Sequence, residues 1–289
     1  MLMKIIDILN QNQKGVAFEF FPPKTESGRR SLAATADALK DFKPLYASMT
    51  YGAGGATQEK TKQAVHMLTK HKDLVVMPHM TCVGADSKSV ISLLDSYRQE
   101  GIDNIMALRG DVPELVEDFD FSKQEFCFAL DLVKFLKNYG HFCIGVAVYP
   151  EGHIETPCLD TGLEYAKRKI DSGADFAVTQ MFFDNKYYYD FLQRAKNKGI
   201  NIPILPGILP LTNLDKVKQF ASICKTTIPK KVRDRMEKFE ANSSDMQKAG
   251  IELTIEQCQD LIKNGVKKLH FFTLNKPEIM KEILGALDL

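Results

Sequence analysis

One pattern repeats along this chain of 289 residues and limits the folds it can adopt: a short apolar run, a polar or glycine-rich stop, and an amphipathic stretch. The apolar runs that we expect to form strands are 16–21, 45–50, 74–80, 104–108, 143–148, 175–182, 203–208 and 268–273. The amphipathic stretches that we expect to form helices are 29–41, 57–71, 87–100, 124–138, 160–172, 186–198, 213–223 and 277–287. Strands that alternate with helices in this way predict an α/β protein, a closed parallel (β/α)8 TIM barrel.

An open doubly wound sheet is the alternative arrangement of alternating strands and helices. The glycine motif Gly-x-Gly-x-x-Gly, which would favour that sheet, does not follow the first strand. The predicted helix boundaries are supported by Asp86 and Asn213, which stand where an N-cap residue is needed before 87–100 and 213–223. The closed barrel is therefore the favoured architecture.

Two segments lie outside the repeat. Residues 1–13 predict a short helix that closes the bottom of the barrel, and Asp7 interrupts its apolar run in a way that a signal peptide does not tolerate. Residues 224–265 form a helical insertion before the eighth strand: Pro229 suits a first turn, and a second helix is expected over 253–264. This insertion either covers the barrel or forms a subunit contact. We expect residues 1–289 to be one catalytic barrel domain.

The composition indicates a cytoplasmic protein without nucleic-acid or membrane partners. There are 38 basic and 37 acidic residues, and no apolar stretch approaches the length of a membrane span. The six cysteines are scattered without a Cys-x-x-Cys, which is typical of reduced thiols. His79 with Cys82, and Glu151 with His153, are close in sequence, but neither pair has a third ligand nearby, so no metal site is expected.

The first strand carries a carboxylate next to a strand stop. Glu19 lies between Phe18 and Phe20, and Pro22 with Pro23 ends the strand because proline cannot donate to a ladder. Desolvation among aromatic rings would raise the pKa of Glu19 and keep its proton near neutral pH, as a general acid requires. The alternative is a rim glutamate that pairs with a nearby Lys or Arg.

Barrel enzymes place their chemistry at the C-terminal ends of the strands. The residues expected at that rim that are polar, ionisable or glycine are Glu19, Thr50, Gly52 to Gly55, His79, Arg109, Gly110, Asp111, Tyr149, His153, Gln180 and Lys276. Each alone has a structural explanation: His79 fits a core histidine, and Arg109 with Asp111 fits a mutual ion pair. So many on one rim favour a functional site.

The residue types at this rim also suggest a ligand. Gly54 and Gly55 before a helix form a candidate anion cradle, and Arg109, Arg168 and Lys169 offer cations for a pyrophosphate. The rim aromatics, which suit a planar heterocycle, are Tyr149, Phe182, Phe183 and Phe220. A planar cofactor beside a buried acid suggests flavin chemistry, but the residue pattern alone does not fix the reaction.

A set of motifs, in order from about residue 15 to the end, resembles the methylenetetrahydrofolate reductase family. The motifs are Phe18-Glu19-Phe20-Phe21-Pro22-Pro23, Thr50-Tyr51-Gly52-Ala53, Leu108-Arg109-Gly110-Asp111, Tyr149-Pro150-Glu151-Gly152-His153, Thr179-Gln180 with Phe182-Phe183-Asp184, Pro206-Gly207-Ile208-Leu209-Pro210 and His270-Phe271-Phe272-Thr273-Leu274-Asn275. The resemblance implies an FAD barrel that takes a hydride from NADH or NADPH. It would then reduce 5,10-methylenetetrahydrofolate to 5-methyltetrahydrofolate by a ping-pong mechanism, which supplies methyl groups for methionine synthesis.

The resemblance also implies roles for individual residues. Glu19 matches the general acid that protonates N10 of the folate, and Asp111 matches an acid between flavin and pterin. The positions that match FAD contacts are Thr50, His79, Leu108, Arg109, Gly110, Asp111, Ala129, Tyr149, His153, Arg168 and Lys169. The positions that match folate contacts are Glu19, Asp111, Gln180, Phe220 and Lys276. A homo-oligomer is expected.

Four positions depart from the family pattern. Phe128 stands where bacterial members have a tyrosine, and Gly162 stands where the family has an aspartate that Asp160 is placed to replace. Lys216 and Lys276 stand where a glutamine and an arginine are common. Two alternatives remain: another FAD barrel oxidoreductase, similar to proline dehydrogenase, and a non-catalytic folate-binding homologue. Glu19 with Gln180 argues against the first, and retention of Glu19, Asp111 and the FAD positions argues against the second.

Overall fold

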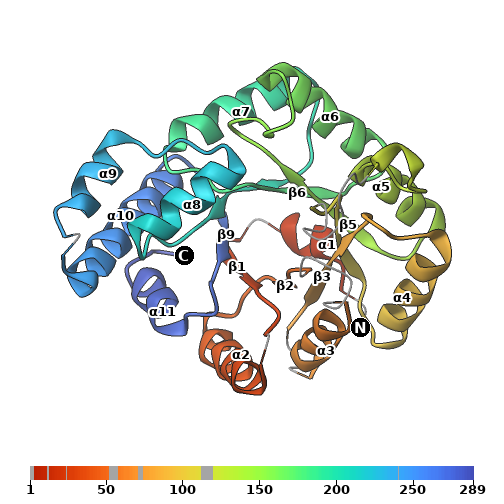
Figure 1. Ribbon diagram of the computed structural model, residues 1–289, viewed down its shortest axis with the longest axis horizontal. Helices are drawn as coiled ribbons and strands as arrows, with labels where there is room; N and C mark the ends of the chain where they lie inside the picture. Colours follow the sequence, from red (N-terminus) through yellow and green to blue (C-terminus); the bar gives the residue numbers. More distant parts are fainter. Residues whose placement is uncertain are drawn as a thin grey trace.

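The computed structural model describes residues 3–11, 13–23, 25–51, 58–70, 74–111, 120–239 and 241–289. Its strands are all parallel and follow the order β7-β6-β5-β4-β3-β2-β1-β9-β8. Their bounds are β1 (Gly15–Phe20), β2 (Ala47–Met49), β3 (Val76–Thr81), β4 (Asn104–Leu108), β5 (Cys143–Val148), β6 (Phe176–Thr179), β7 (Ile204–Leu205), β8 (Gly207–Ile208) and β9 (Lys268–Phe272). Figure 1 shows the helices arranged around these strands, which confirms the predicted TIM barrel.

The predicted seventh strand is divided at Pro206 into β7 and β8. β7 pairs with β6 and β8 pairs with β9, so this one segment closes the ring. Proline has no N–H to donate, but the Pro206 carbonyl still accepts a hydrogen bond from the backbone N–H of His270, at 3.1 Å. Gly207 follows because a Cβ there would lie 2.3 Å from the carbonyl oxygen of Thr179. The closed ring excludes the open sheet.

The helices that the sequence predicts are present, mostly with boundaries that differ by a few residues, but the helix expected over 253–264 begins ten residues earlier, at Ser243. Their bounds are α1 (Ile5–Leu9), α2 (Glu26–Leu39), α3 (Gln58–Thr69), α4 (Ser87–Gln99), α5 (Ala129–Tyr139), α6 (Leu159–Asp171), α7 (Asn185–Asn197), α8 (Leu214–Cys224), α9 (Lys230–Glu237), α10 (Ser243–Lys263) and α11 (Pro277–Gly285). The predicted N-caps are confirmed, because Asp86 accepts from the backbone N–H of Ser89 and Asn213 from that of Lys216. In the described residues no helix is long and apolar enough to cross a membrane.

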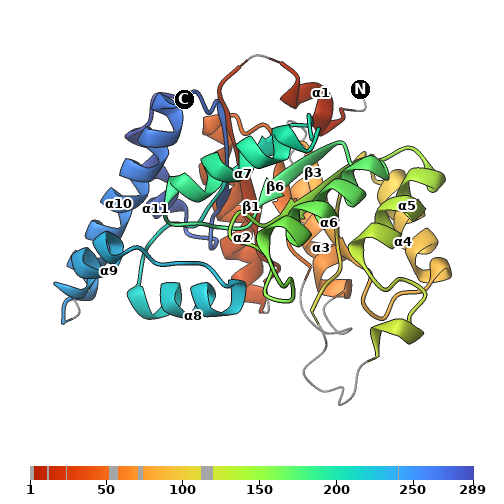
Figure 2. The ribbon, with the colours of Figure 1, turned by 90° about the horizontal axis from the view of Figure 1, so that it is seen from above.

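The N-terminal helix α1 closes the bottom of the barrel, as predicted. Ile5, Ile8 and Leu9 are buried in a cluster with side chains from the strands. The backbone N–H of Ile5 donates to the Asn104 side chain at 2.7 Å, at the start of β4. Figure 2 shows α1 at one end of the strands and α8 at the other, so the mouth of the barrel is the end on which α8 lies.

The outer ring of helices differs from the prediction in one place. The stretch 213–223 was expected to be the seventh ring helix, but α10 occupies that position between α7 and α11 (Figure 1). Ile251, Cys258 and Leu261 of α10 belong to the main core, whereas the apolar face of α8 packs in a separate cluster. The prediction is wrong because helical periodicity marks an apolar face but does not say which partner that face will cover.

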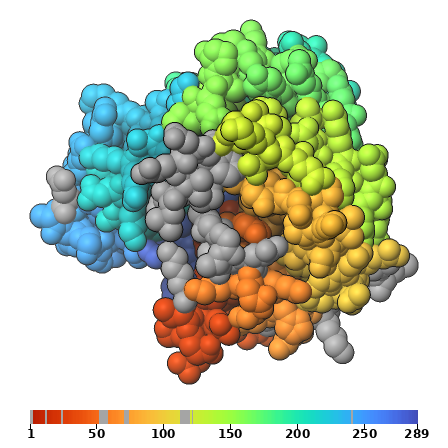
Figure 3. Space-filling model, turned by 45° about the vertical axis from the view of Figure 1, so that its right-hand side comes forward, coloured from red at the N-terminus to blue at the C-terminus, as the bar shows by residue number. Residues whose placement is uncertain are grey.

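The helices α8 and α9 therefore form an excursion that lies outside the ring, whereas α10, the second helix of the insertion, covers the barrel core. In α9, Val232 and Met236 are buried, but Phe239, just beyond it, is 36% exposed. In Figure 3, α8 (cyan) and the segment around α5 (yellow-green) stand on opposite sides of the mouth. Whether the insertion also forms a subunit contact stays a prediction.

Candidate active site

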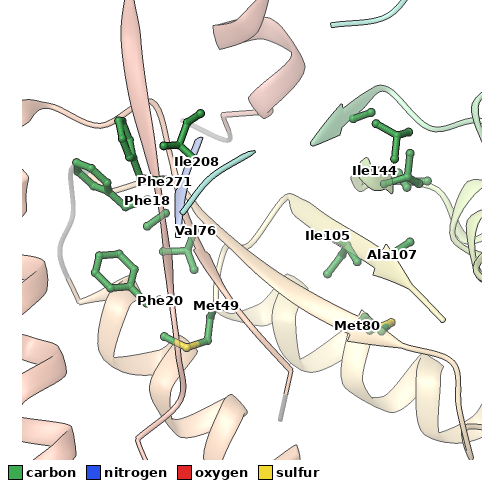
Figure 4. Close-up of a cluster of buried hydrophobic side chains, with 14 of the residues drawn as sticks. Phe18, Phe20, Met49, Val76, Met80, Ile105, Ala107, Ile144, Ile208 and Phe271 are labelled. Carbon is green, nitrogen blue, oxygen red and sulfur yellow. The ribbon is translucent and has the colours of Figure 1, made fainter. Parts of the chain in front are cut away.

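Glu19 lies inside the barrel and not among the neighbouring rings. Side chains alternate along a strand, so Phe18 and Phe20 point outward and pack in the core that β1 shares with the helices (Figure 4). The Glu19 side chain, 8% exposed, points the other way. Its Oε2 lies 3.1 Å from Nε2 of His270, 3.3 Å from Nε2 of His79 and 3.4 Å from the hydroxyl of Ser48, which donates to it.

These neighbours reverse the direction in which the pKa of Glu19 was expected to shift. Burial raises the pKa of this carboxyl, but His79 and His270 together outweigh burial and hold it below its ordinary value. The expectation of a raised pKa is therefore wrong for the protein without ligands. Among the described residues, the side chains that pair with the Glu19 carboxylate are histidines rather than the Lys or Arg of the alternative interpretation.

A second set of contacts holds this cluster in place. Nδ1 of His270 lies 3.0 Å from the hydroxyl of Tyr46, and both side chains are fully buried. Thr273 fixes the backbone of Glu19, because its hydroxyl and its N–H both donate to the Glu19 carbonyl, at 2.7 and 3.1 Å. We refer to Glu19, Tyr46, Ser48, His79 and His270 as the acid cluster.

Three members of the acid cluster were missed as site residues: Tyr46, Ser48 and His270. Ser48 is the register partner of Glu19 across β1 and β2, so a correct strand register would have identified it. His270 was noted within a motif, but its inward direction depends on the pairing of β9 with β1. Tyr46 precedes β2, in an apolar run whose side-chain directions were not assigned.

A second group of charged and aromatic residues follows β4 and β5. Arg109 donates through Nη1 and Nη2 to the two carboxylate oxygens of Glu155, at 2.5 and 2.7 Å. The rings of Tyr149 and His153 meet edge to face with centroids 4.7 Å apart. Lys169, on α6, donates from Nζ to the Ala147 carbonyl at 2.6 Å. We refer to Arg109, Tyr149, His153, Glu155 and Lys169 as the cation cluster.

Electrostatic interactions show that these groups are close to one another. Burial lowers the pKa of His153; the charges of Arg109 and Lys169 lower it as well, whereas those of Glu155 and Asp111 oppose the shift. Burial raises the pKa of Tyr149 to about 12 and lowers that of Lys169 to about 8. The suggested ion pair of Arg109 with Asp111 is replaced by the bidentate pair with Glu155, a residue that the sequence did not identify.

The remaining predicted FAD positions differ in how they join this cluster. Gly110 has φ +89°, and a Cβ there would lie 2.8 Å from Cβ of Thr81, so this turn requires glycine. Thr50 directly follows β2, Leu108 is the last residue of β4 and Ala129 is the first residue of α5. Arg168 precedes Lys169 on α6, but its side chain is exposed and lies near Glu164 and the ring of Tyr165. The structure therefore does not bring Arg168 into the cation cluster.

The other three predicted folate positions come from separate parts of the chain: the loop after β6, helix α8 and the loop before α11. Gln180 follows β6 and accepts a hydrogen bond from the N–H of Met181 at 2.9 Å. Phe220, on α8, packs against the apolar cluster of the excursion. Lys276 precedes α11; burial lowers its pKa, and the charge of Lys216 lowers it further, so the two lysines are close.

Three further expectations concern the anion cradle, the absence of a metal site and Phe128. The candidate anion cradle at Gly54 and Gly55 lies outside the described residues. Within the part of the chain that the structure describes, no three His, Cys, Asp or Glu side chains gather in an arrangement that would hold a metal ion. Phe128, in place of the family's tyrosine, is 58% exposed at the start of α5.

Comparison with known proteins identifies relatives along the whole chain. A family model described as Methylenetetrahydrofolate reductase matches residues 4–288. The chain is 36% identical over 300 residues to Methylenetetrahydrofolate reductase (NADH) 1 of Arabidopsis thaliana, which covers 99% of this chain and 50% of that protein. It is 35% identical over 277 residues to 5,10-methylenetetrahydrofolate reductase of Escherichia coli K12, which covers 96% and 92%. The chain thus spans about half the length of the plant relative.

Solved structures share the fold at low sequence identity. An uncharacterized protein from Clostridium thermocellum, which binds two copies of 5-methyl-5,6,7,8-tetrahydrofolic acid, gives a TM-score of 0.63 over 98% of this chain and 96% of that chain, at 17% identity. Dihydropteroate synthase from Xanthomonas albilineans gives a TM-score of 0.54 over 95% and 92%, at 11% identity. These two likenesses concern the fold alone.

Proposed function

This chain belongs to the methylenetetrahydrofolate reductase family, and we propose that it reduces 5,10-methylenetetrahydrofolate to 5-methyltetrahydrofolate. The observation that carries the proposal is the buried carboxylate of Glu19 at the mouth of the barrel, with a histidine Nε2 on two sides. Opening the five-membered ring of this folate requires a proton on N10. A carboxyl group surrounded by proton donors is suited to deliver it.

The residues of the cation cluster fit FAD as the resident cofactor. Arg109 and Lys169 would hold the diphosphate, Gly110 would admit the cofactor close to the backbone, and Tyr149 with His153 would contact it. When bound, FAD supplies the hydride chemistry between a nicotinamide and the folate. Thr50, His79, Leu108, Asp111 and Ala129 complete the proposed FAD site, with Arg168 as an outer contact.

The chain's own residues would position the folate and move one proton. Gln180 would bind the pterin, and Phe220 would pack on the nicotinamide or on the benzoyl ring. Lys276 would meet the glutamate tail, and the nearby Lys216 adds a second cation for that anion. Asp111, whose charge reaches Arg109 and Tyr149, would lie between flavin and pterin.

Nicotinamide and folate would use the same face of the cofactor in turn, so the proposed kinetics are ping-pong, with NADH or NADPH as reductant. The Arabidopsis relative carries NADH in its name. We further propose a cytoplasmic, homo-oligomeric, single-domain enzyme that provides methyl groups for methionine synthesis. The cysteines of the described chain are free, which is consistent with a reducing compartment.

The visible spectrum of the purified protein tests this function. We expect a yellow protein that releases free FAD on denaturation, because no covalent attachment is proposed. NADH or NADPH should bleach the flavin spectrum, and 5,10-methylenetetrahydrofolate should restore it. Release of FMN, or a reduced flavin that this folate does not reoxidise, would contradict the proposal. Reoxidation by a different acceptor alone would favour another FAD barrel oxidoreductase.

A further inference from the structure

The hydrogen bonds of Tyr46 fix the state of one of the two histidines that face Glu19. Burial raises the pKa of the Tyr46 hydroxyl, which therefore keeps its proton. Among the described residues its hydrogen-bond partner is Nδ1 of His270, at 3.0 Å. An unpaired buried donor costs about 1–3 kcal/mol, so the hydroxyl donates and Nδ1 of His270 accepts.

The state of His270 follows from that bond. An imidazole nitrogen that accepts a hydrogen bond carries no proton, so His270 is neutral and its proton is on Nε2. That nitrogen lies 3.1 Å from Oε2 of Glu19 and donates to it. His270 thus contributes a fixed hydrogen bond to the carboxylate. If His270 gave this proton to Glu19, it would become an imidazolate unless Tyr46 transferred its own proton to Nδ1 of His270.

His79 faces the same oxygen without such a restraint. Its Nε2 lies 3.3 Å from Oε2 of Glu19, and no hydrogen bond of good geometry is formed by this buried nitrogen in the described chain. Both side chains are 8% exposed. An isolated charge is costly at such burial, and a cation beside the carboxylate offsets that cost.

We propose that the proton which Glu19 gives to the folate is held in the resting protein on Nε2 of His79, while Tyr46 locks His270 as a neutral donor. The proposal rests on the proposed function of Glu19 and assigns the source of its proton. His79 is thereby a residue that supplies the general acid, in addition to the cofactor contact that its sequence position implies.

The transfer balances in two steps. The N–H bond on Nε2 of His79 breaks and an O–H bond forms on Oε2 of Glu19, which leaves both groups neutral. The O–H bond then breaks as an N–H bond forms on N10 of the folate, which leaves a carboxylate and a neutral His79. Water restores the proton to His79 before the next turnover. The other titratable groups that face this pair are His270 on β9 and Tyr46 before β2, with Cys143 of β5 beside Tyr46.

Nitrogen NMR of the FAD-loaded protein labelled in its histidines tests the proton placement directly. The chain has six histidines, so His79→Gln and His270→Gln assign the two signals by their loss. We expect His270 to show the neutral Nε2–H form and His79 to carry a proton on both ring nitrogens in the resting protein. Tyr46→Phe removes the hydroxyl that donates to Nδ1 of His270, so His270 should become able to take a second proton. A charged His270 beside a constantly neutral His79 in the wild type would overturn the proposal.

The pH profile of folate reduction supplies a second test. In stopped flow, the reduced wild-type protein should transfer to 5,10-methylenetetrahydrofolate more slowly as pH rises and the His79–Glu19 pair loses its proton. His79→Gln should lower that rate by about 10²-fold at neutral pH and flatten the profile. The matched control is His141→Gln, which removes a histidine that precedes β5 and whose Nε2 lies 2.9 Å from the buried carboxylate of Asp103. Its profile should keep the wild-type shape.

The outcomes separate the two proposals. If His79→Gln keeps the wild-type pH profile, the proton has another source and the role of His79 is wrong. If the wild type reduces no methylenetetrahydrofolate at all, the proposed function fails. The NMR experiment still reports, in that case, which histidine shares a proton with Glu19.

Discussion

The acid cluster inside the barrel and the cation cluster on its loops are built in different ways. The acid cluster comes from β1, β3, β9 and the segment around β2, and its polar groups face one another inside the protein. The cation cluster comes from the loops after β4 and β5 and from α6, and its Arg109 is paired with the exposed Glu155. The polar groups of the first site pair mainly with one another, whereas the second site holds cations that suit an anionic ligand.

This comparison shows which part of the fold fixes the geometry of a proton transfer and which part provides the contacts of a cofactor. Chemistry that depends on one proton needs fixed distances, and strands in register provide them. Binding of a large cofactor needs reachable cations and ring edges, and loops carried by a rigid barrel provide those. We therefore expect substitutions in the acid cluster to affect one reaction step, and substitutions in the cation cluster to affect cofactor affinity.

The largest expected effect is that of Glu19→Gln. Glutamine has nearly the same shape but cannot donate a carboxylic proton, so the folate half-reaction should slow by at least about 10²-fold more than the nicotinamide half-reaction. Stopped-flow traces of flavin reduction and reoxidation measure the two rates separately. Equal losses in both would show that Glu19 maintains the shape of the site instead of supplying a proton.

The pH dependence of FAD affinity should be the next largest effect. Burial lowers the pKa of Lys169 to about 8, so its ammonium is charged below pH 8 and becomes a neutral amine above it. FAD affinity should be constant below about pH 8 and fall by about tenfold for each pH unit above it. Fluorescence titration of the apoprotein measures this. Lys169→Met should bind weakly with a flat profile, and a wild-type affinity that does not change up to about pH 9.5 would remove Lys169 from the FAD site.

Asp111→Asn should affect folate turnover more than FAD binding. We expect folate turnover to fall about fivefold while FAD affinity changes by less than about twofold, because one acid among many contacts matters little for holding the cofactor. Steady-state turnover and FAD titration on the same preparation test this. Unchanged turnover would exclude Asp111 from the mechanism.

Glu155→Gln should have the smallest effect. The Glu155 side chain is 56% exposed, and pairs of this kind contribute about 0–1 kcal/mol. We expect a loss of less than about 1 kcal/mol in the stability of the apoprotein and a change in FAD affinity of less than about threefold. Thermal melts with and without FAD measure both. A tenfold loss of affinity would mean that Glu155 orients Arg109 for the cofactor.

Periodicity in the sequence was sufficient to predict the barrel, because parallel strands and ring helices leave regular apolar patterns. It was not sufficient to assign α10 to the ring in place of α8, since both stretches are amphipathic. Glu19 was correctly placed at a strand end, but its surroundings depend on Ser48, His79 and His270, which lie far away in the chain. Strand register brings those residues together, and register is a tertiary property that a local hexapeptide does not contain.

The excursion of α8 and α9 has a consequence for how a protein of this kind can diverge. The wall of the barrel is completed by α10, which approaches so closely that a Cβ on Gly250 would lie 1.8 Å from the carbonyl oxygen of Leu211. The chain between Asn213 and Asn242 leaves the wall and returns to it, so this segment can change in sequence or length without a change in the wall. Insertions, deletions and new side chains can accumulate there under selection for a different substrate, while the wall and the proton chemistry inside it are inherited unchanged.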